Sequence, residues 1–519
     1  MISHQVSRVR LSINVLANVL GVVAGALVSL LLTPYIIRSL GPAAYSLVPL
    51  ATQITLYFSL ATVAVNSMSA RFVTHELHGG RTDEARVYLS TTMVSNLGLL
   101  VLLAPVAALV VWRADSFLDV PDSVRSDFRL LLIYSFLGFA LSLVSSVFAI
   151  RLFVGDAFAA QSAIGLVGAL GRALSILILF SMFPPSISFV GLASVVSAGL
   201  IAGLQFGVGR RVVPALRASL ALFRWSAAAT LIRAGFWALV SQASQLLLSG
   251  VSLLIANVFI GARAAAPYAI ALIVPNLVSG VIAALSSVFV PTLIGAHARG
   301  EGAMLLYSLR RGNRVVGSVV CLICGDLVVF GKDFYRLWLP TQDSRELWFL
   351  TLIILTPMAV FAANGCLFSM YTVLNRLRSI SVVTLIAGIV SVCLTVILLQ
   401  LHLIDPPVFA IPLSSGAIMV LVNGVFLPWS VGRLLGVRGR VFISESITFV
   451  VWLILLGLCG GLTRYWFGSS NWGELVGAVS VYSALGGALL CVRVIGTRRV
   501  AARFRDQFSS AVHALARRD

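Results

Sequence analysis

The sequence predicts an all-α polytopic membrane protein with about fourteen transmembrane helices. Hydrophobic residues make up 59% of its 519 residues and charged residues only 11%, and the mean hydropathy is +1.02. No soluble domain has this composition. Apolar runs of about 18 or more residues recur along the chain, each long enough to cross a hydrocarbon core roughly 30 Å thick. The polar segments between these runs are too short to hold a soluble catalytic domain.

The apolar runs define the predicted helices in order. Six begin near residues 12, 42, 87, 129, 157 and 186, six near 234, 267, 315, 346, 379 and 407, and two near 446 and 472; the run from 315 to 331 is the shortest. The first run continues to Ile37, which is too long for a signal peptide, so we expect it to be retained. The predicted domains are an N-lobe (1–230), a C-lobe (231–435), and a segment with two more helices and a basic tail (436–519).

Arginine placement predicts the orientation. If the N-terminus is cytoplasmic, the tails and even-numbered loops hold most of the arginines, whereas the opposite side holds few basic residues and the single lysine, Lys332. Cytoplasmic loops of membrane proteins carry this excess, so both termini are expected in the cytoplasm. The net charge of +19 is then a topology signal that also attracts anionic membrane lipids, and it does not indicate nucleic-acid binding.

A faint internal repeat has an offset of 220 residues. "LGPAAY" recurs as "IGARAAAPY", which matches Gly41 to Gly261, and "HGGRTDEARVY" recurs as "ARGEGAMLLY", which matches Gly80 to Gly300. "FLDVP" and "LWLP" follow at a similar spacing. Six predicted helices separate the copies, and an even number preserves direction across the bilayer. We therefore expect two parallel six-helix lobes around a central cavity, with the two C-terminal helices added, and alternating access by rocking of the lobes.

The segment between the lobes, "RRVVPALRASLALFRWSAAATLIR" (210–233), alternates arginines with large apolar residues. This pattern is typical of an amphipathic helix on the inner leaflet. An ordinary cytoplasmic connector with topological arginines explains the pattern equally well, so both interpretations stay open.

One arginine interrupts the apolar run "QSAIGLVGALGRALSILILF" (161–180). On a helical wheel Gln161, Gly165, Gly168 and Ser175 lie within about 60° of Arg172, and leucines cover the other side. A cation at this depth is costly, and the side chain leans toward the more distant membrane surface, which disfavours snorkelling. We expect Arg172 to face a cavity or an ion-pair partner.

Other predicted helices carry polar stripes. They contain Ser241, Gln245, Ser249 and Ser252 in the seventh helix, Asn14, Asn18, Ser29 and Thr33 in the first, and Thr52, Gln53, Ser59 and Asn66 in the second. For any single serine or threonine, a hydrogen bond between helices is the better explanation. The set as a whole indicates a wet central cavity.

Asp326 is the other ionisable residue clearly inside a run. It could balance the charge of Arg172, carry a proton, or lie in the outer interface near Lys332, and we favour the interface because the run is short.

Motifs for chemistry are lacking in the sequence. His75 and His78 are three residues apart but form no H-E-x-x-H motif, and there is no P-loop, G-x-S-x-G motif or pair of carboxylates on one helix face. Cys321 and Cys324 lie in an apolar run and are expected to pack between helices. We expect no enzymatic activity, no catalytic residue, no metal and no cofactor.

Three segments, "LLTPYIIRSLGPAAYSLVPL", "SARFVTHELHGGRTDEAR" and "FGKDFYRLWLP", resemble the polysaccharide repeat-unit flippases of the multidrug/oligosaccharidyl-lipid/polysaccharide exporter superfamily. The resemblance extends from about residue 8 to 495. It implies a bacterial inner-membrane protein that moves undecaprenyl-pyrophosphate-linked oligosaccharide (an O-antigen or exopolysaccharide unit) to the periplasmic leaflet, with a polysaccharide polymerase and glycosyltransferases as possible partners. By position in the bundle it implies that Arg172, Asn18 and Gln245 line the cavity.

The candidate substrate-binding residues are Arg172, Gln161, Asn18, Gln53, Gln245 and Ser249, and Asp326 is the candidate for charge or proton coupling. Ser46 and Pro340 replace glycines that are usual in relatives, and Ser252 stands where many have an aspartate, which weakens a cation site there.

A multidrug exporter of the same superfamily is the first alternative, but it predicts a mid-span acid in the first six helices, where none occurs. A peptidoglycan-precursor flippase would be expected to have more cavity arginines. A membrane scaffold for glycan assembly, without transport, would instead bury the polar stripes in helix contacts.

Overall fold

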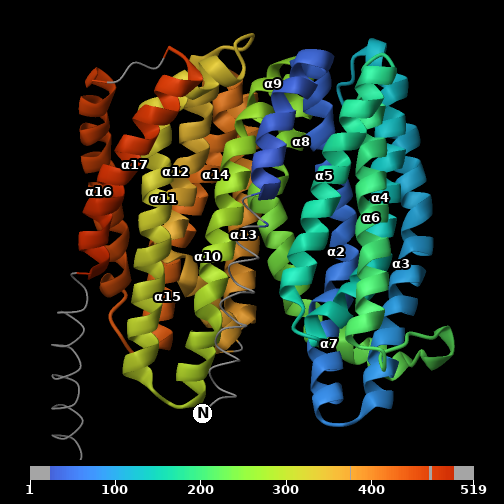
Figure 1. The fold of residues 1–519 in the computed structure, drawn as a ribbon. Helices are drawn as coiled ribbons and strands as arrows, with labels where there is room; N and C mark the ends of the chain where they lie inside the picture. The colour runs from blue at the N-terminus through green and yellow to red at the C-terminus, as the bar shows by residue number, and fades with distance from the viewer. Residues whose placement is uncertain (1–20, 22–23, 375, 467–469, 496–519) are drawn as a thin grey trace, which may run out of the picture. The chain divides into compact units, whose positions relative to one another are not determined.

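The computed structural model describes residues 21, 24–374, 376–466 and 470–495. Its helices are Ala24–Leu40, α2 (Pro42–His78), α3 (Thr82–Phe117), α4 (Arg125–Val154), α5 (Phe158–Met182), α6 (Ile187–Val212), α7 (Trp225–Gln245), α8 (Ser252–Ile260), α9 (Ala262–Ala271), α10 (Ile273–Ala298), α11 (Gly302–Trp338), α12 (Ser344–Val373), α13 (Leu377–Gln400), α14 (Ala410–Val420), α15 (Leu427–Leu434), α16 (Arg440–Trp466) and α17 (Trp472–Ile495) (Figure 1). Short 3-10 turns follow residues 121, 219 and 406, and π-helical turns, η3 and η5, occupy Leu246–Gly250 and Leu421–Phe426.

The predicted all-α polytopic membrane fold is confirmed. Twelve helices of the described chain are long and apolar enough to cross a membrane, and the bent pair Trp225–Gly250 and Ser252–Ile260 makes a thirteenth if it counts as one span. The helix Ala24–Leu40 is shorter and is the described part of the first predicted run.

Contacts divide the chain into two compact units. Unit 1 contains residues 1–270 and 377–411, and unit 2 contains residues 271–376 and 412–519. Helices α7 and α8, most of α9, and α13 therefore belong with the first helices of the chain. The boundaries of the predicted N-lobe and C-lobe remain a prediction.

The internal repeat is visible in the backbone. Gly41 has φ 82° and ψ 159°, and Gly261 has φ 86° and ψ 161°; Gly80 and Gly300 have φ 74° and 70°. Glycine adopts this region without the penalty that a Cβ would bring, so the matched glycines mark matched turns. Helix α2 and the α9–α10 span (Ala262–Ala298) differ by 220 residues at both ends.

Local sequence signals explain where several helices begin. Pro42 opens α2 at a position where a missing N–H is tolerated. The side chains of Ser186 and Asp343 accept backbone N–H bonds at the starts of α6 and α12. In the turn before α11, hydrogen bonds from Arg299 hold the pKa of the Glu301 carboxyl below its usual range.

The predicted short helix at 315–331 is wrong in length. Helix α11 has 37 residues and continues on both sides of that run. Its first turns contain Arg310, Arg311 and Arg314, so they do not register as an apolar run although they are helical.

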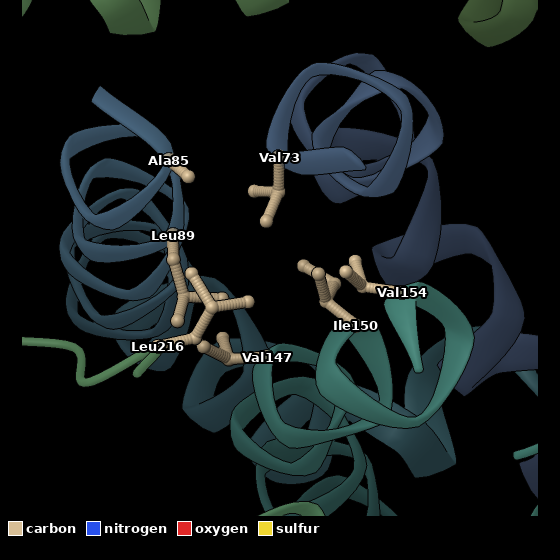
Figure 2. Close-up of a cluster of buried hydrophobic side chains, with 7 residues drawn as sticks. All are labelled: Val73, Ala85, Leu89, Val147, Ile150, Val154 and Leu216. Carbon is tan, nitrogen blue, oxygen red and sulfur yellow. The ribbon is translucent and has the colours of Figure 1, made fainter. Parts of the chain in front are cut away.

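The connector after α6 is not an amphipathic helix. Its only regular structure is the three-residue turn Leu220–Leu222, and α7 already begins at Trp225. Leu216 is fully buried in a hydrophobic cluster with side chains from α2, α3 and α4 (Figure 2). Arg224 pairs with Glu84 at 2.8 Å. The segment is therefore an ordinary connector. Burial of Leu216 and the ion pair of Arg224 hold it against the ends of the neighbouring helices.

Candidate functional site

Arg172 lies in the second half of α5, ten residues before its last residue, Met182. Its Nε is buried and has no hydrogen-bond partner, and no described carboxylate lies within ion-pair distance of the guanidinium. Its electrostatic neighbour is the hydroxyl of Tyr45, in the first turn of α2, which lies beside the Thr33 side chain. Sequence reasoning did not single out Tyr45, although it is part of the repeated "LGPAAY" motif.

Arg172 is half-buried, and three helices of unit 1 lie around it. Tyr35 of the helix Ala24–Leu40 contacts Phe180 of α5 with ring centroids 5.8 Å apart. Nearer the start of both helices, a Cβ on Gly21 would lie 3.2 Å from the Ser162 side chain. The first helix thus lies along α5, and Tyr45 adds α2. The guanidinium is placed among helices and not on the outer surface of α5.

The small residues around Arg172 do not form one cavity-facing stripe. The Ser197 hydroxyl of α6 donates to the Gly168 carbonyl at 2.8 Å, and a Cβ on Gly168 would lie 2.5 Å from Ile201. Gly168 therefore packs against α6, and its predicted cavity-facing position is wrong. Small residues let membrane helices approach closely, which gives the same pattern in the sequence. Gly165 has no neighbour within 4 Å, and Gln161 is exposed.

Gln53 of α2 faces the π-helical turn η3. Its Oε1 is buried without a hydrogen-bond partner, and a Cβ on Gly250 would lie 3.6 Å from that oxygen. One turn further along α2, the Tyr57 hydroxyl donates to the Gly250 carbonyl at 2.8 Å. An unmade hydrogen bond at a buried amide costs about 1–3 kcal/mol. Gln53 therefore holds an unpaired acceptor at the contact between α2 and η3.

The polar stripe predicted for the seventh helix is broken at η3. Gln245 is half-buried, and the exposed Ser249 hydroxyl donates to the Gln245 carbonyl at 2.9 Å. Ser252, beyond the 42° bend, is buried beside Tyr268. A π turn inserts one residue and rotates the helical turns beyond it, so Ser252 leaves the face that Ser249 occupies. The prediction of one continuous face through Ser252 is wrong.

Part of the second-helix stripe makes contacts between helices. Asn66 and Asn96 of α3 exchange hydrogen bonds at 3.2 and 3.1 Å, and Asn96 also donates to the Leu143 carbonyl of α4. The hydroxyls of Thr52 and Ser59 bond to carbonyls of their own helix. Asn96 was missed in the sequence because an isolated asparagine in an apolar run has no pattern.

Two sequence candidates lie apart from this set. Asn18 is outside the described residues. Asp326 belongs to unit 2 and accepts hydrogen bonds at 3.1 and 3.3 Å from the Ser483 hydroxyl of α17. It is twelve residues from the end of α11 at Trp338, so the placement at a helix end near Lys332 is wrong, because the helix is longer than its apolar run.

No family model matches the chain. An uncharacterised membrane protein of Bacillus subtilis (strain 168), EpsK, is 28% identical over 440 residues, which cover 84% of this chain and 86% of EpsK. Among solved structures, the lipid II flippase MurJ in an inward closed conformation matches with a TM-score of 0.63 at 10% identity, covering 93% of this chain and 99% of MurJ.

An outward-facing multidrug resistance MATE transporter matches with a TM-score of 0.59 at 13% identity, covering 84% of this chain and 96% of the transporter. An inward-facing MATE structure gives 0.57, also at 13% identity, over 81% and 96%. MATE transporters and MurJ share one membrane fold, and this chain matches nearly the whole of each. The chain therefore has the membrane fold of the MATE and MurJ structures, which is the fold that the resemblance drawn from its motifs implies.

Proposed function

We propose that the chain is a flippase that moves undecaprenyl-pyrophosphate-linked oligosaccharide from the cytoplasmic to the periplasmic leaflet of the bacterial inner membrane. The observation that carries the proposal is Arg172, a half-buried cation between helices with a buried, unpartnered Nε and no described carboxylate to neutralise it. A guanidinium held in this way is poised for a multivalent anion, because its planar fork matches phosphate oxygens bidentately.

The other polar groups of unit 1 suit a glycan. Gln53 offers an unpartnered acceptor, and the exposed Ser249 and Gln161 offer donors and acceptors that can replace water around sugar hydroxyls. The polyprenyl chain can remain in lipid, so only the pyrophosphate and sugars need polar contacts. One of the matched structures is described as a flippase for lipid II, and its fold covers 93% of this chain.

The multidrug interpretation has the support of the MATE matches. It requires a site that attracts cationic or amphipathic drugs, whereas the group found at depth in unit 1 is itself a cation. The two functions make opposite demands on Arg172, because removing its charge favours binding of a cationic drug and disfavours binding of a pyrophosphate.

The test compares Arg172→Ala and Arg172→Lys in cells in which surface glycan is measured at matched protein level. One or two charge-assisted hydrogen bonds are worth about 1.5–3 kcal/mol each, so we expect the alanine variant to lose roughly tenfold or more of its export rate. The lysine variant retains charge without the fork and should be intermediate. Arg113→Ala is the matched control, because Arg113 is exposed and rests on Trp112. Full export by the alanine variant contradicts the proposal, and drug efflux that depends on the chain supports the alternative.

A further inference from the structure

The last turn of α4 holds a buried arginine, Arg151. Only 5% of its surface is exposed. Helices α4 and α6 run side by side (Figure 1), and α6 passes Arg151 at Gly209, where a Cβ would lie 3.4 Å from the Arg151 Cβ and 3.5 Å from its Cδ. The glycine leaves the room that the stem of the arginine occupies, so the side chain is confined between the two helices.

The polar atoms in this space lack partners. Nε and one terminal nitrogen of Arg151 are buried and donate no hydrogen bond. Gln205, one turn before Gly209 on α6, is 8% exposed, and its Oε1 accepts none. Buried side-chain polar atoms in folded proteins normally have partners, so two exceptions on a pair of helices that pack together need a physical explanation.

A second cation adds to the positive charge. The Arg210 guanidinium lies over the Phe206 ring at 4.9 Å, and that of Arg151 over the Phe148 ring at 5.7 Å. The two rings meet edge to face with centroids 5.1 Å apart. Two arginines therefore bracket one aromatic pair, and their charges repel each other. In the described part of the chain neither arginine forms an ion pair.

We infer that Arg151, Gln205 and Arg210 form a binding site for a phosphate group, separate from Arg172. An anion beside the aromatic pair, within reach of both guanidinium groups, would give the unpartnered Arg151 donors an acceptor and reduce the repulsion between the two charges. Phosphate has the oxygens that arginine forks bind. The Gln205 amide can turn its NH₂ toward the same anion, because its oxygen and nitrogen ends exchange by rotation.

The depth of the site fits a membrane interface. Arg151 is three residues from the end of α4 at Val154, which is about 5 Å along the helix axis. The adjacent end of α6 carries the exposed Arg210 and Arg211. A membrane-spanning helix ends near the headgroup layer, so the phosphate of a phospholipid or a free phosphate from the solvent can both reach such a site. Both sources share the same recognition chemistry.

The test uses the purified full chain and two probes: inorganic phosphate, followed by calorimetry, and phosphatidylglycerol, followed by native mass spectrometry against a phosphatidylcholine background. We expect saturable binding of one probe or both. Binding of phosphatidylglycerol alone assigns a lipid headgroup, and binding of inorganic phosphate assigns a free phosphate. Arg151→Gln should weaken binding at least tenfold, while Arg211→Gln, an exposed neighbour outside the bracketed rings, should change it less than twofold.

Two results would overturn the site: absence of binding of either probe to the wild-type chain, or equal binding by the Arg151→Gln variant. If that variant does not accumulate, the affinity of Arg210→Gln tests the site instead, because Arg210 is exposed and its loss leaves the helix packing intact. A several-fold loss of affinity in Arg210→Gln supports the site, and unchanged affinity contradicts the proposal.

Discussion

Asn257 of α8 forms two hydrogen bonds with the backbone of Asp119, in the loop after α3. The Asn257 amide accepts the Asp119 backbone N–H at 3.0 Å and donates to the Asp119 carbonyl at 3.0 Å. The Asp119 carboxylate accepts the Ala262 N–H at 2.7 Å and so caps α9. Asn257 is 2% exposed, so its side of these bonds is shielded from water in the folded chain.

Asn257→Ala removes both amide bonds and leaves the backbone N–H and C=O of Asp119 to find other partners. At about 0.5–1.5 kcal/mol for each bond, plus some desolvation cost, we expect a loss of roughly 2–3 kcal/mol in the free energy of unfolding. Asp119→Ala keeps the two main-chain bonds and removes only the cap of Ala262, which is worth about 1–2 kcal/mol.

The assay is reversible unfolding of the purified chain in mixed micelles, with both single variants and the double variant. Ser249→Ala is the control, because the Ser249 hydroxyl is exposed and bonds within its own helix. The double variant measures the coupling between the Asn257 bonds and the Asp119 cap of α9. A loss below about 0.5 kcal/mol for Asn257→Ala would refute the reasoning, since it would mean that these bonds are readily replaced.

The packing and the charges predict three further outcomes. Gly235→Ala should abolish accumulation or cost more than about 3 kcal/mol, because its Cβ would lie 1.9 Å from a backbone carbonyl of α2; normal thermal stability of this variant would count against that contact. Glu445→Ala should lower the free energy of unfolding by about 3–5 kcal/mol, because it leaves Arg314 without the carboxylate that lies 2.6–3.0 Å from its nitrogens. Glu445→Gln should cost less, and equal costs for the two variants would contradict the charge argument. Cysteines replacing Arg299 and Thr341, at opposite ends of α11, should be labelled by an impermeant reagent only at Thr341 in intact spheroplasts, with the parent chain as background; labelling at Arg299 instead would invert the proposed topology.

The helices and the repeat were predictable because they depend on hydropathy and on residue spacing, which can be read directly from the sequence. Apolar runs of membrane length predicted the spans. Glycines at a constant spacing predicted the repeat, and in the structure they lie in turns that glycine adopts freely. The same signals failed where a helix leaves the apolar layer. The arginine-rich start of α11 is helical, but nothing in its hydropathy separates it from a loop.

The candidate site was less predictable because side-chain burial depends on neighbouring helices. Gly168 and Gly165 look alike in the sequence, yet only Gly168 has α6 against it. Arg151 appeared to be one of many topological arginines, and its burial is set by Gly209 on another helix. Arg172 stood out in the sequence because a single charge in an apolar run is rare enough to be informative.

The central claim is that Arg172 binds the pyrophosphate of a lipid-linked sugar. It is tested most directly by titrating the purified chain with undecaprenyl pyrophosphate and with undecaprenol, which lacks the charged group, for the wild type and Arg172→Gln. The account predicts that the wild type prefers the pyrophosphate by at least tenfold and that the variant loses this preference while its affinity for undecaprenol is unchanged. Equal discrimination by the wild type and the variant would contradict it.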